Sequence, residues 1–123
     1  LGRERPALAA IALTVNSSLL TALVNDGDQE QVFARQVEAL GQRGDVLIAI
    51  STSGNSPNVN RAARMARDKG LNIIALTGKK GGELVGHADV SIIIPSENTQ
   101  RIQESHITVG HILCDLVEVA LFD

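Results

Sequence analysis

The residues best suited to chemistry form one short segment, residues 50–56, which reads Ile-Ser-Thr-Ser-Gly-Asn-Ser and is followed by Pro57. Because Pro fits the first turn of a helix, we expect the segment to lie at a helix N-terminus. Unpaired backbone N–H groups and the helix dipole favour an anion there, and the hydroxyl groups add donors to phosphate oxygens. Gly54 permits a close approach of the backbone to such a ligand.

The same segment contains no Lys or Arg and lacks the Gly, Lys and Ser/Thr pattern of triphosphate-binding loops. A monophosphate therefore suits it better than a nucleotide triphosphate with magnesium. The alternative is a Ser-rich connection that only caps a helix, and composition alone does not decide between the two interpretations.

A second set of polar residues interrupts an apolar stretch near the end of the chain and consists of Gln103, Glu104, His106 and His111. On a helix, Gln103 and His111 are separated by about two turns plus 80°, whereas Gln103 and His106 are about one turn apart. Neither spacing alone is a metal-binding signature. A His on a buried helix is more often a hydrogen-bonded structural residue than a catalytic one, so the helical pattern leaves its role open.

A third polar segment, Asn25-Asp26-Gly27, is typical of a turn. A carboxylate beside the carboxyl edge of a sheet would also bind sugar hydroxyls, so both interpretations stay open.

Length and composition favour one domain over residues 1–123, because 123 residues with 44% hydrophobic content suffice for a single core. A net charge of -3 with scattered Lys and Arg argues against direct nucleic-acid binding and against an anionic membrane, which leaves a small ligand.

The single Cys114 excludes an intrachain disulfide and favours a cytoplasmic location. We expect no bilayer-spanning segment. The first residues lack an initiator Met, so the chain is expected to begin within a longer protein.

Apolar runs and turn residues predict strands alternating with helices, hence a parallel sheet with ligands at the carboxyl ends of its strands. The last helix has few wholly polar faces, so we expect it to be buried or to lie at an oligomer interface. The expected strands are residues 8–13, 45–50, 71–76 and 90–94, and the expected helices are residues 18–24, 30–40, 58–69 and 100–121.

Taken together, these motifs resemble the sugar isomerase (SIS) family and, within it, the phosphoheptose isomerases. The resemblance rests on residues 44–56, on Ala75-Leu76-Thr77-Gly78, and on Arg101-Ile102-Gln103-Glu104 with the two following histidines. It implies a three-layer α/β/α sandwich of flavodoxin-like type, with N-terminal helices and a first strand missing from this chain. It further implies that substrate is bound by Asn25, Asp26, Ser51, Thr52, Ser53, Ser56 and Gln103, that zinc is bound by Gln103 and His111, and that His111 is the catalytic acid/base.

The implied reaction converts sedoheptulose 7-phosphate to D-glycero-D-manno-heptose 7-phosphate, in the route to ADP-heptose and the lipopolysaccharide core. A proton moves between C1 and C2 through an enediol, which requires a second group besides His111. In the family this group is a Glu just upstream of a stretch whose remnant here is Leu1-Gly2-Arg3. We therefore expect this piece alone to be inactive and its sheet to have an exposed edge. The family also implies a homotetramer with sites at subunit contacts.

Two other functions fit the same fold. The DnaA initiator-associating proteins act by protein contact in replication initiation and lack a His at the position of His111, which favours the enzyme. A regulatory SIS domain would sense a sugar phosphate without converting it. Such domains accompany a DNA-binding module, and the sequence shows none.

Overall fold

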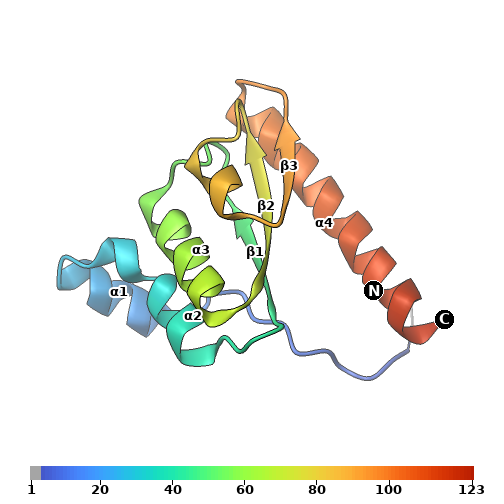
Figure 1. Ribbon diagram of the computed structural model, residues 1–123, viewed down its shortest axis with the longest axis horizontal. Helices are drawn as coiled ribbons and strands as arrows, with labels where there is room; N and C mark the ends of the chain where they lie inside the picture. The colour runs from blue at the N-terminus through green and yellow to red at the C-terminus, as the bar shows by residue number, and fades with distance from the viewer. Residues whose placement is uncertain (1–3) are drawn as a thin grey trace.

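The computed structural model describes residues 4–123, in which a parallel sheet carries helices on both faces (Figure 1). The sheet has the order β1-β2-β3, and its parallel pairing places Ile50 opposite Leu76 and Gly78 opposite Ile94. This confirms the alternation of strands and helices inferred from the sequence. The elements are α1 (Ser17–Asn25), η1 (Gln29–Gln31), α2 (Ala34–Leu40), β1 (Val46–Ile50), α3 (Pro57–Lys69), β2 (Asn72–Gly78), η2 (Glu83–His87), β3 (Val90–Ile94) and α4 (Thr99–Phe122).

The strand expected at residues 8–13 is wrong, because this segment is irregular in the structure. A strand forms only when its backbone N–H and C=O groups pair with a neighbouring strand. Among the described residues β1 pairs with β2 alone, so β1 is an edge strand as expected, and residues 8–13 do not pair with it. The helix expected over residues 30–40 is also shorter: a 3-10 turn, η1, precedes α2, which begins at Ala34.

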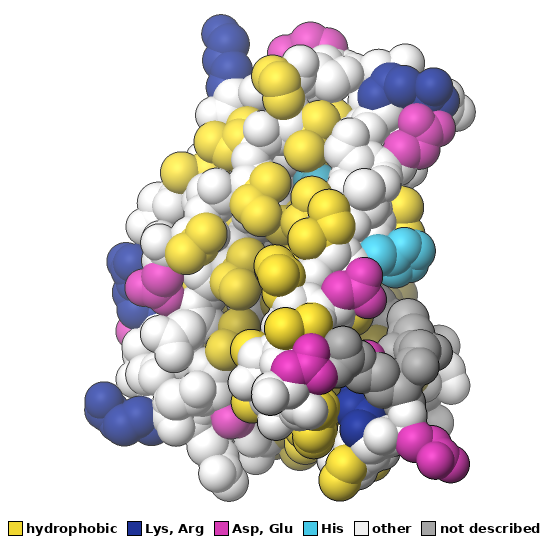
Figure 2. Space-filling view, turned by 90° about the vertical axis from the view of Figure 1, so that its right-hand side faces the viewer, with side chains coloured by type: hydrophobic (Ala, Val, Ile, Leu, Met, Phe, Trp, Pro, Cys, Tyr) yellow, Lys and Arg dark blue, Asp and Glu magenta, His cyan; other side chains and the backbone are white. Residues whose placement is uncertain are grey.

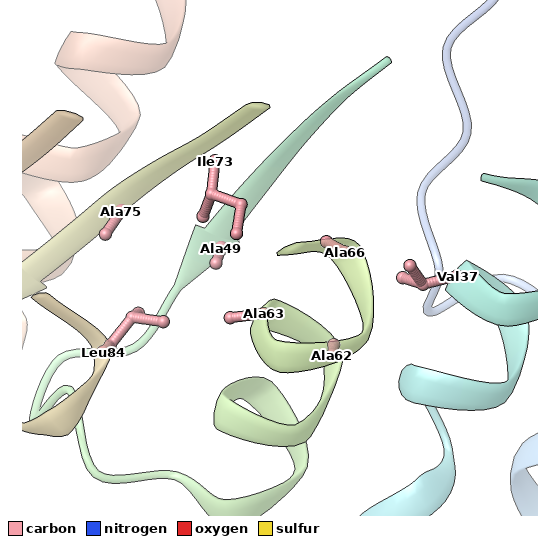
Figure 3. Close-up of a cluster of buried hydrophobic side chains, with 8 residues drawn as sticks. All are labelled: Val37, Ala49, Ala62, Ala63, Ala66, Ile73, Ala75 and Leu84. Carbon is pink, nitrogen blue, oxygen red and sulfur yellow. The ribbon is translucent and has the colours of Figure 1, made fainter. Parts of the chain in front are cut away.

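Helix α3 packs on one face of the sheet through small side chains. Ala62, Ala63 and Ala66 belong to one buried cluster with Ala49 and Ile73 of the strands (Figure 3). Side chains of this size bring the helix close to the strands, and close packing holds the first turn of α3 at the end of β1. The helix ends at Gly70, whose φ of 80° is the left-handed conformation of a C-terminal cap.

Helix α4 lies on the opposite face of the sheet, because Gly78 alternates with the residues that face α3. A Cβ atom at Gly78 would lie 2.7 Å from Cγ1 of Ile102, which is fully buried. Gly at this position therefore allows α4 to approach the end of β2. The helix starts at a cap in which Asn98 Oδ1 accepts hydrogen bonds from the backbone N–H groups of Gln100 and Arg101, at 3.0 and 3.2 Å.

Most of α4 is not covered by the rest of the described chain, so of the two expected arrangements, burial within the chain or a place at an oligomer interface, the first is not observed. Its buried residues are Ile102, His106 and Glu118. Hydrophobic side chains gather on this side of the molecule (Figure 2). The exposed large hydrophobic residues of α4 and of β1 include Ile107, Ile112, Leu116, Val117, Val119, Leu121, Val46, Ile48 and Ile50.

By length and composition alone, α4 is also long and apolar enough to cross a membrane, which corrects the sequence expectation. Two polar contacts nevertheless tie the helix to the rest of the chain. His106 Nε2 lies 2.8 Å from Thr77 O, and Glu118 accepts a hydrogen bond of 2.7 Å from Arg5 Nη2. Helices with this composition also occur in proteins where another protein surface covers the apolar side.

Candidate functional site

Residues 51–56, called the hydroxyl-rich loop below, connect β1 to α3. The first residue of the loop, Ser51, donates its backbone N–H to Leu76 O on β2 at 3.0 Å. The Ser51 and Ser56 hydroxyls lie 2.8 Å apart, and the Gly54 N–H donates to Ser51 Oγ at 3.1 Å. Ser51 is buried, whereas Thr52, Ser53 and Ser56 are half-buried. The hydrogen bond to β2 thus fixes the start of the loop, and the half-buried residues leave the loop partly accessible to solvent.

Several donors of this loop are left for a ligand. Within residues 4–123, the backbone N–H groups of Thr52, Ser53 and Ser56 and the Thr52 hydroxyl make no hydrogen bond. Ser56 is the N-cap of α3 but forms no side-chain capping bond, and Pro57 occupies the first turn as expected. Unpaired N–H groups at the positive end of a 13-residue helix favour a small anion such as a phosphate group.

A second loop, residues 79–83, packs against the hydroxyl-rich loop and was not identified from the sequence. Gly54 has a φ of 68°, and a Cβ atom there would collide with the Gly81 carbonyl oxygen. Asn55 Oδ1 accepts the Glu83 N–H and Gly54 O accepts the Leu84 N–H, both at 2.9 Å. The adjacent glycines Gly81 and Gly82 are the only sequence signal for this contact, and they do not specify what approaches them.

The polar residues of α4 face different directions. His106 is buried and hydrogen-bonded to β2, whereas Gln103 and His111 are exposed. His111 lies five positions after His106, which corresponds to about 140° around the helix and about 7.5 Å along its axis. His111 therefore points away from the sheet, and α4 runs away from the carboxyl ends of the strands (Figure 1). The structure does not bring His111 to the hydroxyl-rich loop of its own chain.

Asn25 and Asp26 lie at the exposed C-terminal end of α1, where Asn25 Nδ2 donates to Asp26 Oδ1 at 3.4 Å. Asn25 lines a shallow surface depression with Leu20, Thr21 and Val24, all from α1 itself. The connection of this region to α3 is indirect: Glu30 forms an ion pair of 2.8 Å with Arg61. Neither Asn25 nor Asp26 contacts the hydroxyl-rich loop through a hydrogen bond within the described part of the chain.

The described residues do not form a zinc site by themselves. Residues 4–123 contain no group of three or more His, Cys, Asp or Glu side chains placed to hold a metal. The two implied ligands, Gln103 and His111, are about 12 Å apart along the axis of α4, whereas zinc is usually held by four ligands at about 2 Å. Leu1-Gly2-Arg3, the expected remnant of the segment that follows the family's Glu, lies outside the described residues.

The contact between the two loops can be tested with Gly54→Ala, using Gly27→Ala as a matched control. Gly27 also has a positive φ, of 81°, but no atom lies within 4 Å of its added Cβ. Each substitution has a conformational cost of about 1 kcal/mol, and the collision with Gly81 should cost Gly54→Ala roughly 1–3 kcal/mol more. Urea unfolding measures the difference. Equal losses of stability in the two variants would contradict the packing described here.

Known proteins resemble the chain in sequence and in structure. A family model described as SIS domain matches residues 1–78. The phosphoheptose isomerases of Thermodesulfovibrio yellowstonii and Roseiflexus sp. are 54% and 55% identical to this chain; each match covers 98% of this chain, and 60% and 61% of the respective relatives. The chain thus spans about 60% of the length of these relatives.

Solved structures agree with these sequence matches. A phosphoheptose isomerase from Francisella tularensis matches with a TM-score of 0.88 and 43% identity, covering 92% of this chain and 61% of that one. Phosphoheptose isomerase GmhA from Neisseria gonorrhoeae matches with a TM-score of 0.86 and 47% identity, covering 89% and 62%. The resemblance inferred from the motifs is therefore confirmed, and the chain belongs to the SIS domain family.

Proposed function

We propose that the protein carrying this chain is a phosphoheptose isomerase that converts sedoheptulose 7-phosphate to D-glycero-D-manno-heptose 7-phosphate. The observation that carries the proposal is the hydroxyl-rich loop, whose unpaired N–H groups and Thr52 hydroxyl suit a phosphate monoester. We infer the seven-carbon sugar from the relatives, which are phosphoheptose isomerases. We place the reaction in the cytoplasm, in the supply of ADP-heptose for the lipopolysaccharide core.

In the proposed reaction, one end of the sugar is bound and the other end reacts. The loop holds the phosphate on C7, which fixes the position of C1 and C2 at the other end of the substrate. Isomerisation moves a proton between these carbons through an enediol, and it needs a base at carbon and an acid/base at the oxygens. We assign the acid/base role to His111 and the second role to a Glu outside this chain. Asn25, Asp26 and Gln103 would contact the sugar hydroxyls.

We further propose that the protein works as a homotetramer. The outward direction of His111 supports this, because a second copy is needed to bring His111 close to a phosphate loop. The apolar surface of α4 supports it independently: Ile107 and Leu116 are 60% and 59% exposed, and apolar areas of this kind mark protein contacts. In such an assembly, α4 would be covered by another subunit rather than by its own chain.

Zinc remains a proposal that rests on the family resemblance. Gln103 and His111 are the ligands that this chain offers, and further ligands would have to come from another copy or from outside residues 4–123. When bound, zinc would polarise the substrate oxygens at C1 and C2. No step assigned here to His111 or to the hydroxyl-rich loop depends on the metal.

Phosphate binding is tested by Thr52→Val, which removes one hydroxyl and keeps the shape of the side chain. Because a hydrogen bond to a charged group is worth about 1.5–3 kcal/mol, we expect the KM for sedoheptulose 7-phosphate to rise at least about tenfold, with kcat little changed. Thr14→Val, at an exposed position outside the helices and strands, is the control and should leave KM unchanged. A KM that stays the same in Thr52→Val would contradict the proposed site.

Catalysis is tested by His111→Ala in the full-length protein. Loss of an acid/base group should lower kcat by about 10²–10⁴-fold while the phosphate end still binds. His87→Ala, which removes a histidine paired with Glu83 on η2, should keep its activity. A parallel assay with a chelator tests zinc. Undiminished activity in His111→Ala would remove this residue from the mechanism, and a folded wild type without isomerase activity would favour the DnaA-binding or regulatory alternatives.

The assembly is tested by Leu116→Glu, with Arg67→Glu as the control. Both positions are exposed within one chain, but Leu116 belongs to the apolar side of α4, whereas Arg67 lies on α3. Light scattering should give a tetramer for the wild type and for Arg67→Glu, and smaller species for Leu116→Glu, because a buried unpaired carboxylate opposes association. A monomeric wild type would rule out the homotetramer.

A further inference from the structure

One buried polar contact connects α4 to the sheet. His106 is 6% exposed, and its Nε2 lies 2.8 Å from the carbonyl oxygen of Thr77, a residue with no exposed surface. A carbonyl oxygen only accepts hydrogen bonds, so the proton lies on Nε2. His106 therefore donates to β2 from the first half of a helix that is otherwise poorly covered.

This contact lies next to the anchor of the hydroxyl-rich loop. Leu76 O accepts the Ser51 N–H at the start of the loop, and Thr77 O, in the next peptide group of the same strand, accepts from His106. Of two consecutive peptide groups of β2, the first therefore bonds to the hydroxyl-rich loop and the second bonds to α4. The relative position of these two parts of the candidate site depends on this short stretch of strand.

The hydrogen bond also sets the rotation of α4 about its own axis. Ile102 packs against Gly78 and fixes how closely the helix approaches, but an apolar contact has little directional preference. The bond from His106, one turn later, does have a preferred direction. The next buried residue of α4 is Glu118, twelve residues further along, where the ion pair with Arg5 is the second polar contact that restrains the helix.

The contact leaves two buried polar atoms of the described chain unpaired, a free-energy cost that an apolar contact would avoid. His106 Nδ1 and Thr77 Oγ1 are buried without a hydrogen-bond partner among the described residues. An apolar side chain of similar size would fill the same space without leaving Nδ1 unpaired. What the imidazole adds is a fixed geometry, which buried polar contacts supply better than apolar ones.

We propose that His106 is a positioning residue: its hydrogen bond to Thr77 O holds α4 in the rotation that places Gln103 and His111 for the reaction. The part of this inference that concerns the reaction rests on the proposed isomerase function. His106 itself faces the sheet and not the substrate. Because Gln103 and His111 lie about 60° and 140° around the helix from His106, a rotation of α4 would move both.

The structural part is tested without any activity measurement, by hydrogen exchange. His106→Leu removes the donor, His106→Gln keeps an amide nitrogen near the position of Nε2, and Ile73→Val lowers stability on the α3 side of β2. We expect faster amide exchange in the middle of α4 for His106→Leu, near wild-type exchange for His106→Gln, and no selective effect on α4 for Ile73→Val. Equal exchange of α4 in the Leu and Gln variants would overturn the proposal.

The catalytic part is tested in the full-length enzyme. His106→Leu should lower kcat by about 10–100-fold, since small misplacements of catalytic groups have effects of this size, while the KM set by the phosphate loop changes little. His106→Gln should restore most of kcat, and Ile73→Val should keep it. If His106→Leu does not fold, His106→Asn replaces it, because its shorter side chain places the amide nitrogen near the position of Nδ1.

The outcomes separate the two proposals. A kcat that falls equally in His106→Leu and Ile73→Val, or that His106→Gln does not restore, would make His106 merely structural and overturn the inference. Absence of isomerase activity in the wild type would overturn the proposed function instead, and hydrogen exchange would still decide whether His106 holds α4.

Discussion

The C-terminal end of β2 is the constraint on which the rest of the candidate site depends. Successive residues of a parallel strand direct their carbonyl groups to opposite neighbours, so Leu76 O faces β1 and the hydroxyl-rich loop while Thr77 O faces away from them. Gly78 then lets Ile102 of α4 approach the strand. One buried strand end therefore fixes the loop, the start of α4 and the direction of the residues that follow.

The loop could be predicted from the sequence because its signals are local. A run of β-branched and aliphatic residues, a cluster of hydroxyls, Gly54 and Pro57 specify a strand, a turn and a helix start within about a dozen positions. The packing of residues 79–83 against this loop could not be predicted in the same way. It joins segments that are far apart in the chain, and two neighbouring glycines show only that something comes close.

The strand wrongly expected at residues 8–13 and the two histidines of α4 also could not be assigned from local sequence patterns. Apolar residues at positions 8–13 indicate a preference for burial, but a strand also needs a partner, and no sequence pattern shows whether one is present. His106 and His111 lie on the same apolar helix, and the hydrophobic pattern does not distinguish them. The hydrogen bond from His106 to Thr77 O and the packing of Ile102 against Gly78 show that His106 faces the sheet, and the helical spacing directs His111 away from it.

Phosphate binding and catalysis are therefore supported to different degrees. The hydroxyl-rich loop has its donors, its helix and its supporting strand within one chain, whereas His111 lies on the outer side of a helix that its own chain leaves largely exposed. Binding energy from a remote group such as a phosphate assists catalysis only when the reacting carbons are held against correctly placed acid and base groups. In this chain the placement of His111 depends on α4. Under the proposed function, the stability of the contact between α4 and β2, rather than the hydroxyl-rich loop, should therefore limit catalysis.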